Sequence, residues 1–149
     1  MERSRALLRS AATLLCGSLL ALAATADDDG PEQVYSGSQV AIAEERWGAV
    51  YDGLSRRAQQ SFEDAMVHVA QHMAMLGITD RRSARDWFIR VVPKTAQLRA
   101  LFEVKEYSVS SVDRKDGEAV LHVVEKGKAE SRAIRMVEED RLWKLDVGL

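Results

Sequence analysis

The stretch that decides the fold is DRKDGEAVLHVVEKGKAESRAIRMVEEDRLWKLDV, residues 113–147. It contains three apolar runs separated by turn sequences, and the first turn carries the Asp116-Gly117 pair. An Asp-Gly pair between alternating segments is a strong signal for a β-hairpin. With the alternating segment that precedes them, these runs predict four strands, over residues 103–112, 118–125, 129–138 and 142–147. Because the turns are short, the strands should pair as an antiparallel meander.

Upstream of this stretch, apolar residues recur every three or four positions, which is typical of one face of a helix. Ser38 is a suitable N-cap, Gly77 is a natural stop, and Pro93 interrupts a helix that opens with a capping sequence at Ser83. The predicted helices cover residues 38–54, 56–76, 83–92 and 95–102. Helices first and strands last indicate the α+β class, with the helices covering one face of the sheet.

The N-terminus has the three parts of a secretory signal peptide. Arg3 and Arg5 precede an apolar run over residues 11–23, and the small-x-small sequence Ala24–Ala26 follows. The run falls short of the ~20 residues of a membrane-spanning helix, although an uncleaved N-terminal anchor is the alternative. We therefore expect residues 1–26 to be removed and the protein to be periplasmic or secreted, with no stable membrane span after cleavage. Residues 27–37 resemble a flexible polar lead, which leaves residues 38–149 as a single domain.

Composition narrows the possible functions. The chain has 149 residues, is 46% hydrophobic and has a net charge of −2, so it is neither disordered nor basic enough to suggest nucleic-acid binding. Its one cysteine, Cys16, lies in the predicted signal peptide, so the mature chain should have neither a disulfide nor thiol chemistry. The sequence contains no phosphate-cradling glycine loop and no nucleophile elbow.

The second predicted helix carries an apolar stripe with alternating spacings of four and three: Phe62, Met66, Val69, Met73 and Leu76. His68 and His72 are four positions apart on the same helix, and Asp64 precedes His68 by four. Such a set could bind a metal. At about 100° per residue, however, the three side chains fan out around the helix and do not converge. We therefore predict no metal site here and keep a metal-binding envelope protein as an alternative.

The order of elements, with DGEAVLHV at residues 116–123 and VEEDRLWKLD at residues 137–146, resembles the NTF2-like superfamily. The likeness is to small exported bacterial domains whose last strand carries a Trp-Lys-[Leu/Ile]-Asp sequence, and it would span residues 38–149. The resemblance implies a cone, in which a curved sheet wraps around the helices and a pocket opens at the mouth. The chain departs from the family in one respect, because only residues 77–82 separate the two helices between which the family has a β-hairpin.

A pocket of this kind has candidate residues in the sequence. His122 alternates with Val120 and Val124 on one face of a central strand, and a histidine there could be a general base. Tyr107 and Asp86 could complete an acid/base set with it, as a ketosteroid isomerase-like plan would need. The candidate ligand-binding residues are Trp143, Trp87, Val120 and Val124.

Three functions follow from these observations. The first is an exported, non-catalytic domain that binds a small apolar ligand or a protein partner and could form a homodimer through the outer face of the sheet. The second is a small isomerase- or cyclase-like enzyme that uses the pocket histidine with an acidic residue. The third is the metal-binding envelope protein. We expect no cofactor and no nucleic-acid partner.

Overall fold

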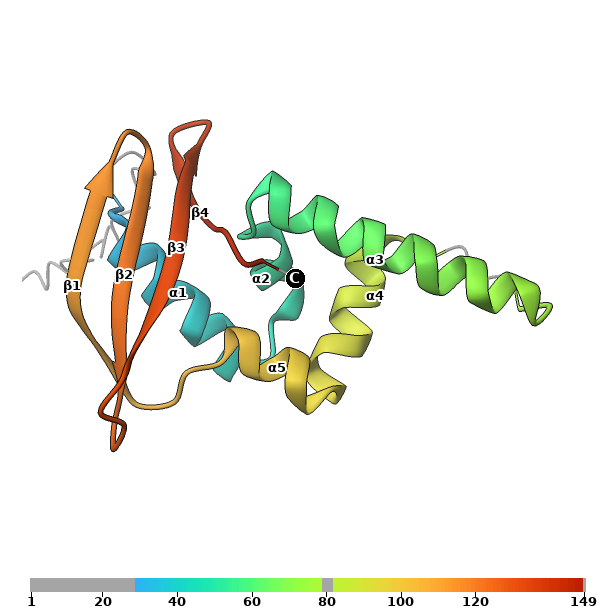
Figure 1. Ribbon diagram of the computed structural model, residues 1–149, viewed down its shortest axis with the longest axis horizontal. Coiled ribbons are helices and arrows are strands. Elements are labelled where there is room, and N and C mark those ends of the chain that lie inside the picture. The colour runs from blue at the N-terminus through green and yellow to red at the C-terminus, as the bar shows by residue number, and fades with distance from the viewer. Residues whose placement is uncertain (1–28, 79–81, 149) are drawn as a thin grey trace, which may run out of the picture.

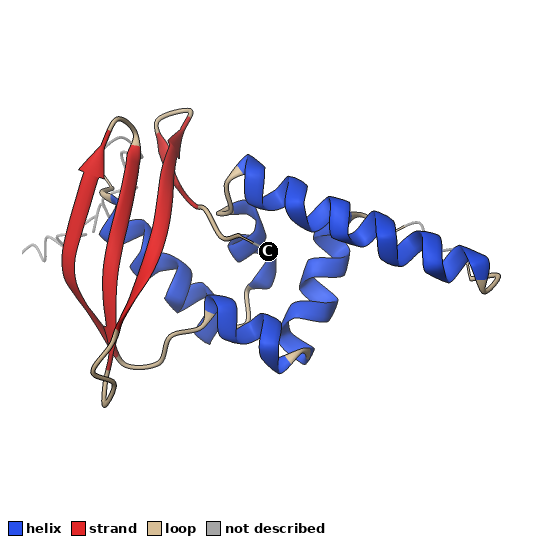
Figure 2. Ribbon diagram, in the orientation of Figure 1, coloured by secondary structure: helices blue, strands red, loops and turns tan. Residues whose placement is uncertain are grey.

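The computed structural model describes residues 29–78 and 82–148. Within them the chain forms five α-helices, a short 3-10 helix and four strands (Figures 1 and 2). The helices are α1 (Pro31–Ala43), α2 (Trp47–Asp52), α3 (Arg56–Met75), α4 (Ala84–Val91), η1 (Val92–Lys94) and α5 (Ala96–Phe102). The strands β1 (Tyr107–Lys115), β2 (Glu118–Glu125), β3 (Ser131–Glu139) and β4 (Leu142–Leu145) pair antiparallel in the order β1-β2-β3-β4. The predicted α+β class and meander are confirmed, and the predicted signal peptide lies outside the described residues.

The first helix is where the sequence prediction is wrong. Instead of one helix over residues 38–54 after a flexible lead, α1 begins at Pro31 and a separate α2 follows. Pro31 occupies the first helical turn, where its missing N–H costs nothing, and the Gln33 side chain accepts a hydrogen bond from the Gly30 backbone at 2.9 Å. Tyr35, inside the predicted lead, is only 1% exposed. The break between the two helices falls at Glu45, whose φ of 55° is left-handed.

The other predicted boundaries differ by a few residues. Ser55 and Ser83 cap α3 and α4 with their side chains, and Gly77 ends α3 with a φ of 75°. Strand β2 spans the predicted residues 118–125. The first strand begins at Tyr107 rather than at residue 103, because the segment after α5 is a connection, and it continues through Lys115 to a tighter turn than predicted.

The core lies between one face of the sheet and the helices. On β2, Ala119, Leu121 and Val123 are buried, whereas the residues between them face away from the helices. Helix α1 contacts β2 and β4, and Figure 1 shows it crossing behind the sheet. Helices α3 and α4 lie to the side, and α3 extends away from the sheet rather than covering it.

An aromatic cluster holds the helices together around Phe88, which is fully buried. Its ring lies edge-on to the rings of Tyr51, Phe62 and Phe102, with centroids 5.2–5.3 Å apart. Edge-to-face pairs of this kind contribute about 0.5–1.5 kcal/mol beyond the area they bury. One ring therefore links α2, α3, α4 and α5.

The end of the sheet is joined to the start of α3 by backbone hydrogen bonds. Leu54 forms a parallel bridge with Leu145 at the end of β4. The Leu145 N–H donates to the Gly53 carbonyl at 2.9 Å, and the Ser55 N–H donates to the Leu145 carbonyl at 2.7 Å. The α2–α3 connection thus runs as an extra short strand beside β4.

A buried carboxylate completes this β4–α3 junction. The Ser55 hydroxyl accepts the Ala58 N–H at 3.0 Å as the cap of α3 and donates to Oδ1 of Asp146 at 2.7 Å. Asp146 also accepts a hydrogen bond from Nε of Arg57 at 3.0 Å, and Nε of Arg135 lies 3.3 Å from its other oxygen. A buried charge is tolerated only when it is paired and hydrogen-bonded, and these three side chains meet that need.

We predict that Asp146→Ala lowers the free energy of unfolding by about 2 kcal/mol, because it removes charge-assisted hydrogen bonds and leaves Ser55 without its acceptor. Urea unfolding followed by circular dichroism measures the change. Asp140→Asn is the matched control: its ion pair with Arg56 is exposed, and Asn tolerates the left-handed φ of 53° at this position, so the loss should cost less than about 0.5 kcal/mol. Equal losses in the two variants would contradict the role given to the junction.

The phenol of Tyr35 titrates far from its ordinary range. Its hydroxyl is buried without a hydrogen-bond partner among the described residues, and desolvation raises the pKa of Tyr35 from 10.0 to about 12. Because the folded pKa lies above the unfolded one, the folded chain holds this proton longer. Stability is therefore unaffected below about pH 10 and declines as the pH rises from about 10 to about 12.

We predict that Tyr35→Phe reduces this alkaline decline. It should also raise the free energy of unfolding at pH 7 by about 1 kcal/mol, because an unpaired buried hydroxyl is removed. Urea unfolding between pH 7 and pH 12 measures both effects. Tyr107→Phe is the comparison: it keeps the buried Tyr35 hydroxyl and removes only the smaller contribution of Tyr107 to the raised pKa of Tyr35, so most of the decline should remain. An alkaline slope that is the same in wild type and Tyr35→Phe would rule out Tyr35 as its source.

Candidate functional site

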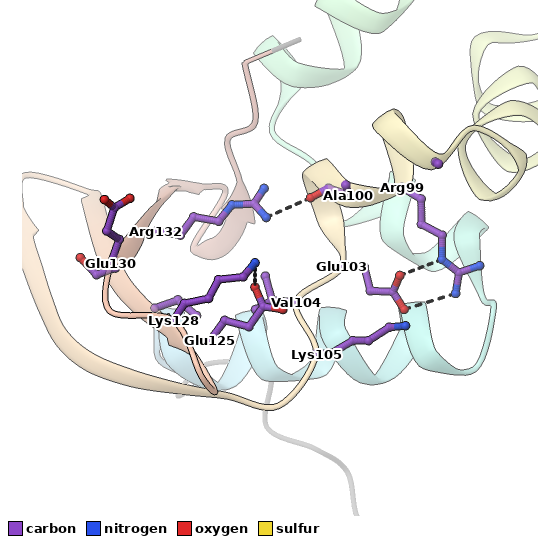
Figure 3. Close-up of a pocket in the computed structure, with 12 residues that line it drawn as sticks. Arg99, Ala100, Glu103, Val104, Lys105, Glu125, Lys128, Glu130 and Arg132 are labelled. Atoms are coloured by element: carbon purple, nitrogen blue, oxygen red, sulfur yellow. Dashed lines mark hydrogen bonds and ion pairs between the residues drawn. The ribbon is translucent and has the colours of Figure 1, made fainter.

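A cleft lies between α5 and the adjoining ends of β2 and β3 (Figure 3). It has a volume of about 620 Å³. Three stretches of chain line it: the exposed side of α5, the connection to β1, and the turn from β2 into β3. The lining residues are Ala96, Arg99, Ala100, Glu103, Val104, Lys105, Val123, Glu125, Lys128, Glu130, Ser131 and Arg132.

Arg132 fixes the width of this cleft. Its guanidinium donates to the Ala100 carbonyl at 3.0 Å and also to the Leu101 carbonyl. Both acceptors belong to the last turn of α5, where carbonyl groups lack partners within the helix and attract positive charge. One side chain of β3 thus holds the C-terminal end of α5 against the sheet.

A second arginine is fixed on the opposite wall. Arg99 makes two hydrogen bonds to the carboxylate of Glu103, at 2.9 and 3.3 Å, and both side chains are partly buried. The hydrogen bond from Arg99 holds the pKa of Glu103 below its usual range. Glu103 therefore stays charged near neutral pH and keeps Arg99 in place.

The charges in the cleft do not cancel. Its lining has four basic residues (Arg99, Lys105, Lys128 and Arg132) and three acidic ones (Glu103, Glu125 and Glu130), a net charge of +1. Lys128 is paired with Glu125. Lys105 is exposed, and its charge acts on Glu103, where together with Arg99 it lowers the pKa of the carboxyl. Figure 3 shows its ammonium beside the Arg99–Glu103 pair.

The three predicted catalytic residues lie apart. His122 is on the sheet face that points away from the helices, where Nε2 lies 3.1 Å from Oδ2 of the exposed Asp113. Tyr107 faces the core, with its ring edge-on to Tyr35 at 5.3 Å. Asp86 is exposed at the start of α4, where its side chain accepts a hydrogen bond from Ser83. The structure does not bring the three together, and none of them lines the cleft.

The four predicted ligand-binding residues also lie outside the cleft. Val120 and Val124 are on the outer sheet face beside His122, while Trp143 and Trp87 pack partly buried against the core. The Arg82 guanidinium lies over the Trp87 ring at 4.7 Å. Val124 does join Tyr107 in the lining of a second hollow of about 390 Å³, which shares Glu125 and Lys128 with the main cleft.

The predicted metal alternative has no assembled ligands in the described part of the chain. His68 and His72 are exposed on α3, and Asp64 accepts a hydrogen bond from Gln60 at 2.9 Å. No group of three His, Cys, Asp or Glu side chains that could hold a metal is present among residues 29–78 and 82–148. None of the helices described is long and apolar enough to cross a bilayer.

Comparison with known proteins gave no match to a family model, a curated protein or a solved structure. The cleft therefore has to be interpreted from its own residues. Sequence reasoning missed it because its walls come from three segments. The one signal for the cleft in the sequence is the alternation of charge over residues 103–106, but such alternation also predicts the start of a strand.

We predict that Arg132→Gln loosens α5 and lowers the free energy of unfolding by about 1–2 kcal/mol, because it removes a charged donor from two helix carbonyls. Amide hydrogen exchange should accelerate over residues 96–102. Arg90→Gln, at an exposed position of α4, is the matched control and should leave this exchange unchanged. Unaltered exchange in Arg132→Gln would show that α5 is held by its apolar contacts alone.

Proposed function

We propose that this chain is an exported, non-catalytic binding domain built on an NTF2-like cone, and that its cleft beside α5 holds a small ligand with an anionic group. Export is supported by the N-terminal pattern of residues 1–26 and places the protein in the periplasm or outside the cell. The cone is supported by the element order, in which helices precede a four-stranded meander and α1 crosses its inner face.

The observation that carries the ligand proposal is the exposed ammonium of Lys105, in a cleft with a net charge of +1 whose other basic groups have hydrogen-bonded or ion-paired partners. Arg99 is held by Glu103 and Arg132 by helix carbonyls, so two cations are fixed in position before any ligand arrives. An anionic group entering between them gains charge-assisted hydrogen bonds without a large ordering cost. Lys105 is then the partner that a carboxylate or phosphate would take.

The state of the cleft carboxylates supports binding over catalysis. A general acid or base works best when its pKa is near the operating pH, but the pKa of Glu103 is lowered, away from neutrality. The Glu103 carboxylate thus suits positioning of the Arg99 side chain rather than proton transfer.

We predict that Lys105→Ala weakens binding of an anionic probe at least tenfold, since it removes the exposed ammonium. Succinate, hexanoate and inorganic phosphate are suitable probes for isothermal titration with protein produced in an exporting host. Lys115→Ala is the matched control: it removes the same charge from the exposed end of β1, outside the cleft, and should bind as wild type does.

Native mass spectrometry of the protein from its host's envelope fraction provides the independent test. A co-purifying anionic molecule that is lost in Lys105→Ala would support the proposal. A bare mass, together with probe binding that is absent or equally weakened by Lys115→Ala, would overturn it.

A further inference from the structure

Helix α3 carries an apolar surface that is exposed in the described part of the chain, residues 29–78 and 82–148. Only its first two turns contribute buried side chains, Ala58 and Phe62, and Met66 is partly buried against the core. Beyond these residues the helix projects from the body (Figure 1). Val69 is 40% exposed and Leu76 is 74% exposed, although both belong to the stripe that begins at Phe62.

This projecting segment, residues 65–78, contains no Asp, Glu, Lys or Arg, in a chain that is 30% charged. Further exposed apolar residues surround its stripe: Val67, Met75 and Ile78. Exposed apolar surface of this kind marks an interaction site, and a lone helix of this length is marginally stable in water without a partner.

The spacing of the stripe identifies the kind of partner. Met66, Val69, Met73 and Leu76 are separated by three, four and three positions, which is the seam of a coiled coil. Ala65 and Ala70 flank the seam and permit close approach of a second helix. A helix that lies on a membrane usually has Lys and Arg on its polar face, and this segment has neither.

We propose that α3 pairs antiparallel with α3 of a second copy of this chain. The absence of charge over residues 65–78 means that two identical faces meet without repulsion. An antiparallel arrangement places the two bodies at opposite ends of the pair, whereas a parallel one would bring them to the same end. Met66 then lies against Leu76 of the second copy, and Val69 against its Met73.

The expected dimer is reversible. The helical part of the segment, residues 65–75, spans about 16 Å, and half the surface of such a helix amounts to roughly 300 Å² per copy. The total of about 600 Å² is well below the ~1,200 Å² of a standard stable interface, so the pairing should be weak. The outer sheet face suits a dimer less well, because Val120 and Val124 are interspersed with His122, Asp113 and Arg135.

Sedimentation equilibrium of the full chain, produced in an exporting host, at 5–200 µM (about a fortyfold range) tests the pairing. Wild type should shift from monomer towards dimer across this range, and Leu76→Glu should remain monomeric. Val40→Glu is the matched control: Val40 is an exposed apolar residue of α1, 49% exposed, and its replacement should leave the dimer intact. Because Leu76 and Val40 are both exposed, neither variant should alter the circular dichroism spectrum.

Cysteine cross-linking tests the antiparallel register in a Cys16→Ser background. Ala70→Cys places the two thiols within about 3 Å along the pair axis, whereas Gln60→Cys on the same helix separates them by about 30 Å. Oxidation should therefore link Ala70→Cys and not Gln60→Cys. A chain that is monomeric at 200 µM overturns the proposal, and so does equal cross-linking of both variants. Binding of the monomer to phosphatidylglycerol vesicles, lost in Leu76→Glu, would instead assign α3 to a membrane.

Discussion

The fold depends on one buried carboxylate. Asp146 accepts hydrogen bonds from Ser55 and Arg57, and Ser55 in turn caps α3. The same few residues therefore start the longest helix and attach it to the last strand. Among the elements that the structure describes, α1 has the main helix contacts with the sheet, so the orientation of α3 and of the aromatic cluster behind it depends on this junction. An apolar residue could fill the space of Asp146, but it could not form hydrogen bonds or ion pairs with Ser55, Arg57 and Arg135.

In the cleft, as at the β4–α3 junction, side chains hold a helix at one of its ends. Helix α5 is short, and its last turn is held by Arg132 while Arg99 is oriented by Glu103. Both arginines are thus committed to structural partners, while Lys105 is exposed. Under the proposed function, this order would reduce the cost of binding an anionic group.

Local patterns predicted most of the elements. The bounds of strand β2 are predicted correctly because a turn sequence marks each of its ends. The start of α3 is predicted correctly, and Ser55 caps the helix there. The start of α1 was missed because the helix is held by a tertiary contact: Tyr35 packs on Tyr107, which lies 72 positions later in the chain. Alternation placed His122 and Val120 on one face of β2, but it could not say that this face is the outer one. The cleft had no local signature, since its charged residues meet only when three segments have folded together.

The position of the β4–α3 junction has a consequence for the order of folding. Ser55 and Asp146 are separated by 91 positions in the chain, and closing a loop of that length costs about 4 kcal/mol of chain entropy. The hairpins of the meander and the individual helices close far shorter loops and can form first. The contact that unites the two halves is therefore a late one. Until the β4 segment is available, the helical half lacks its anchor.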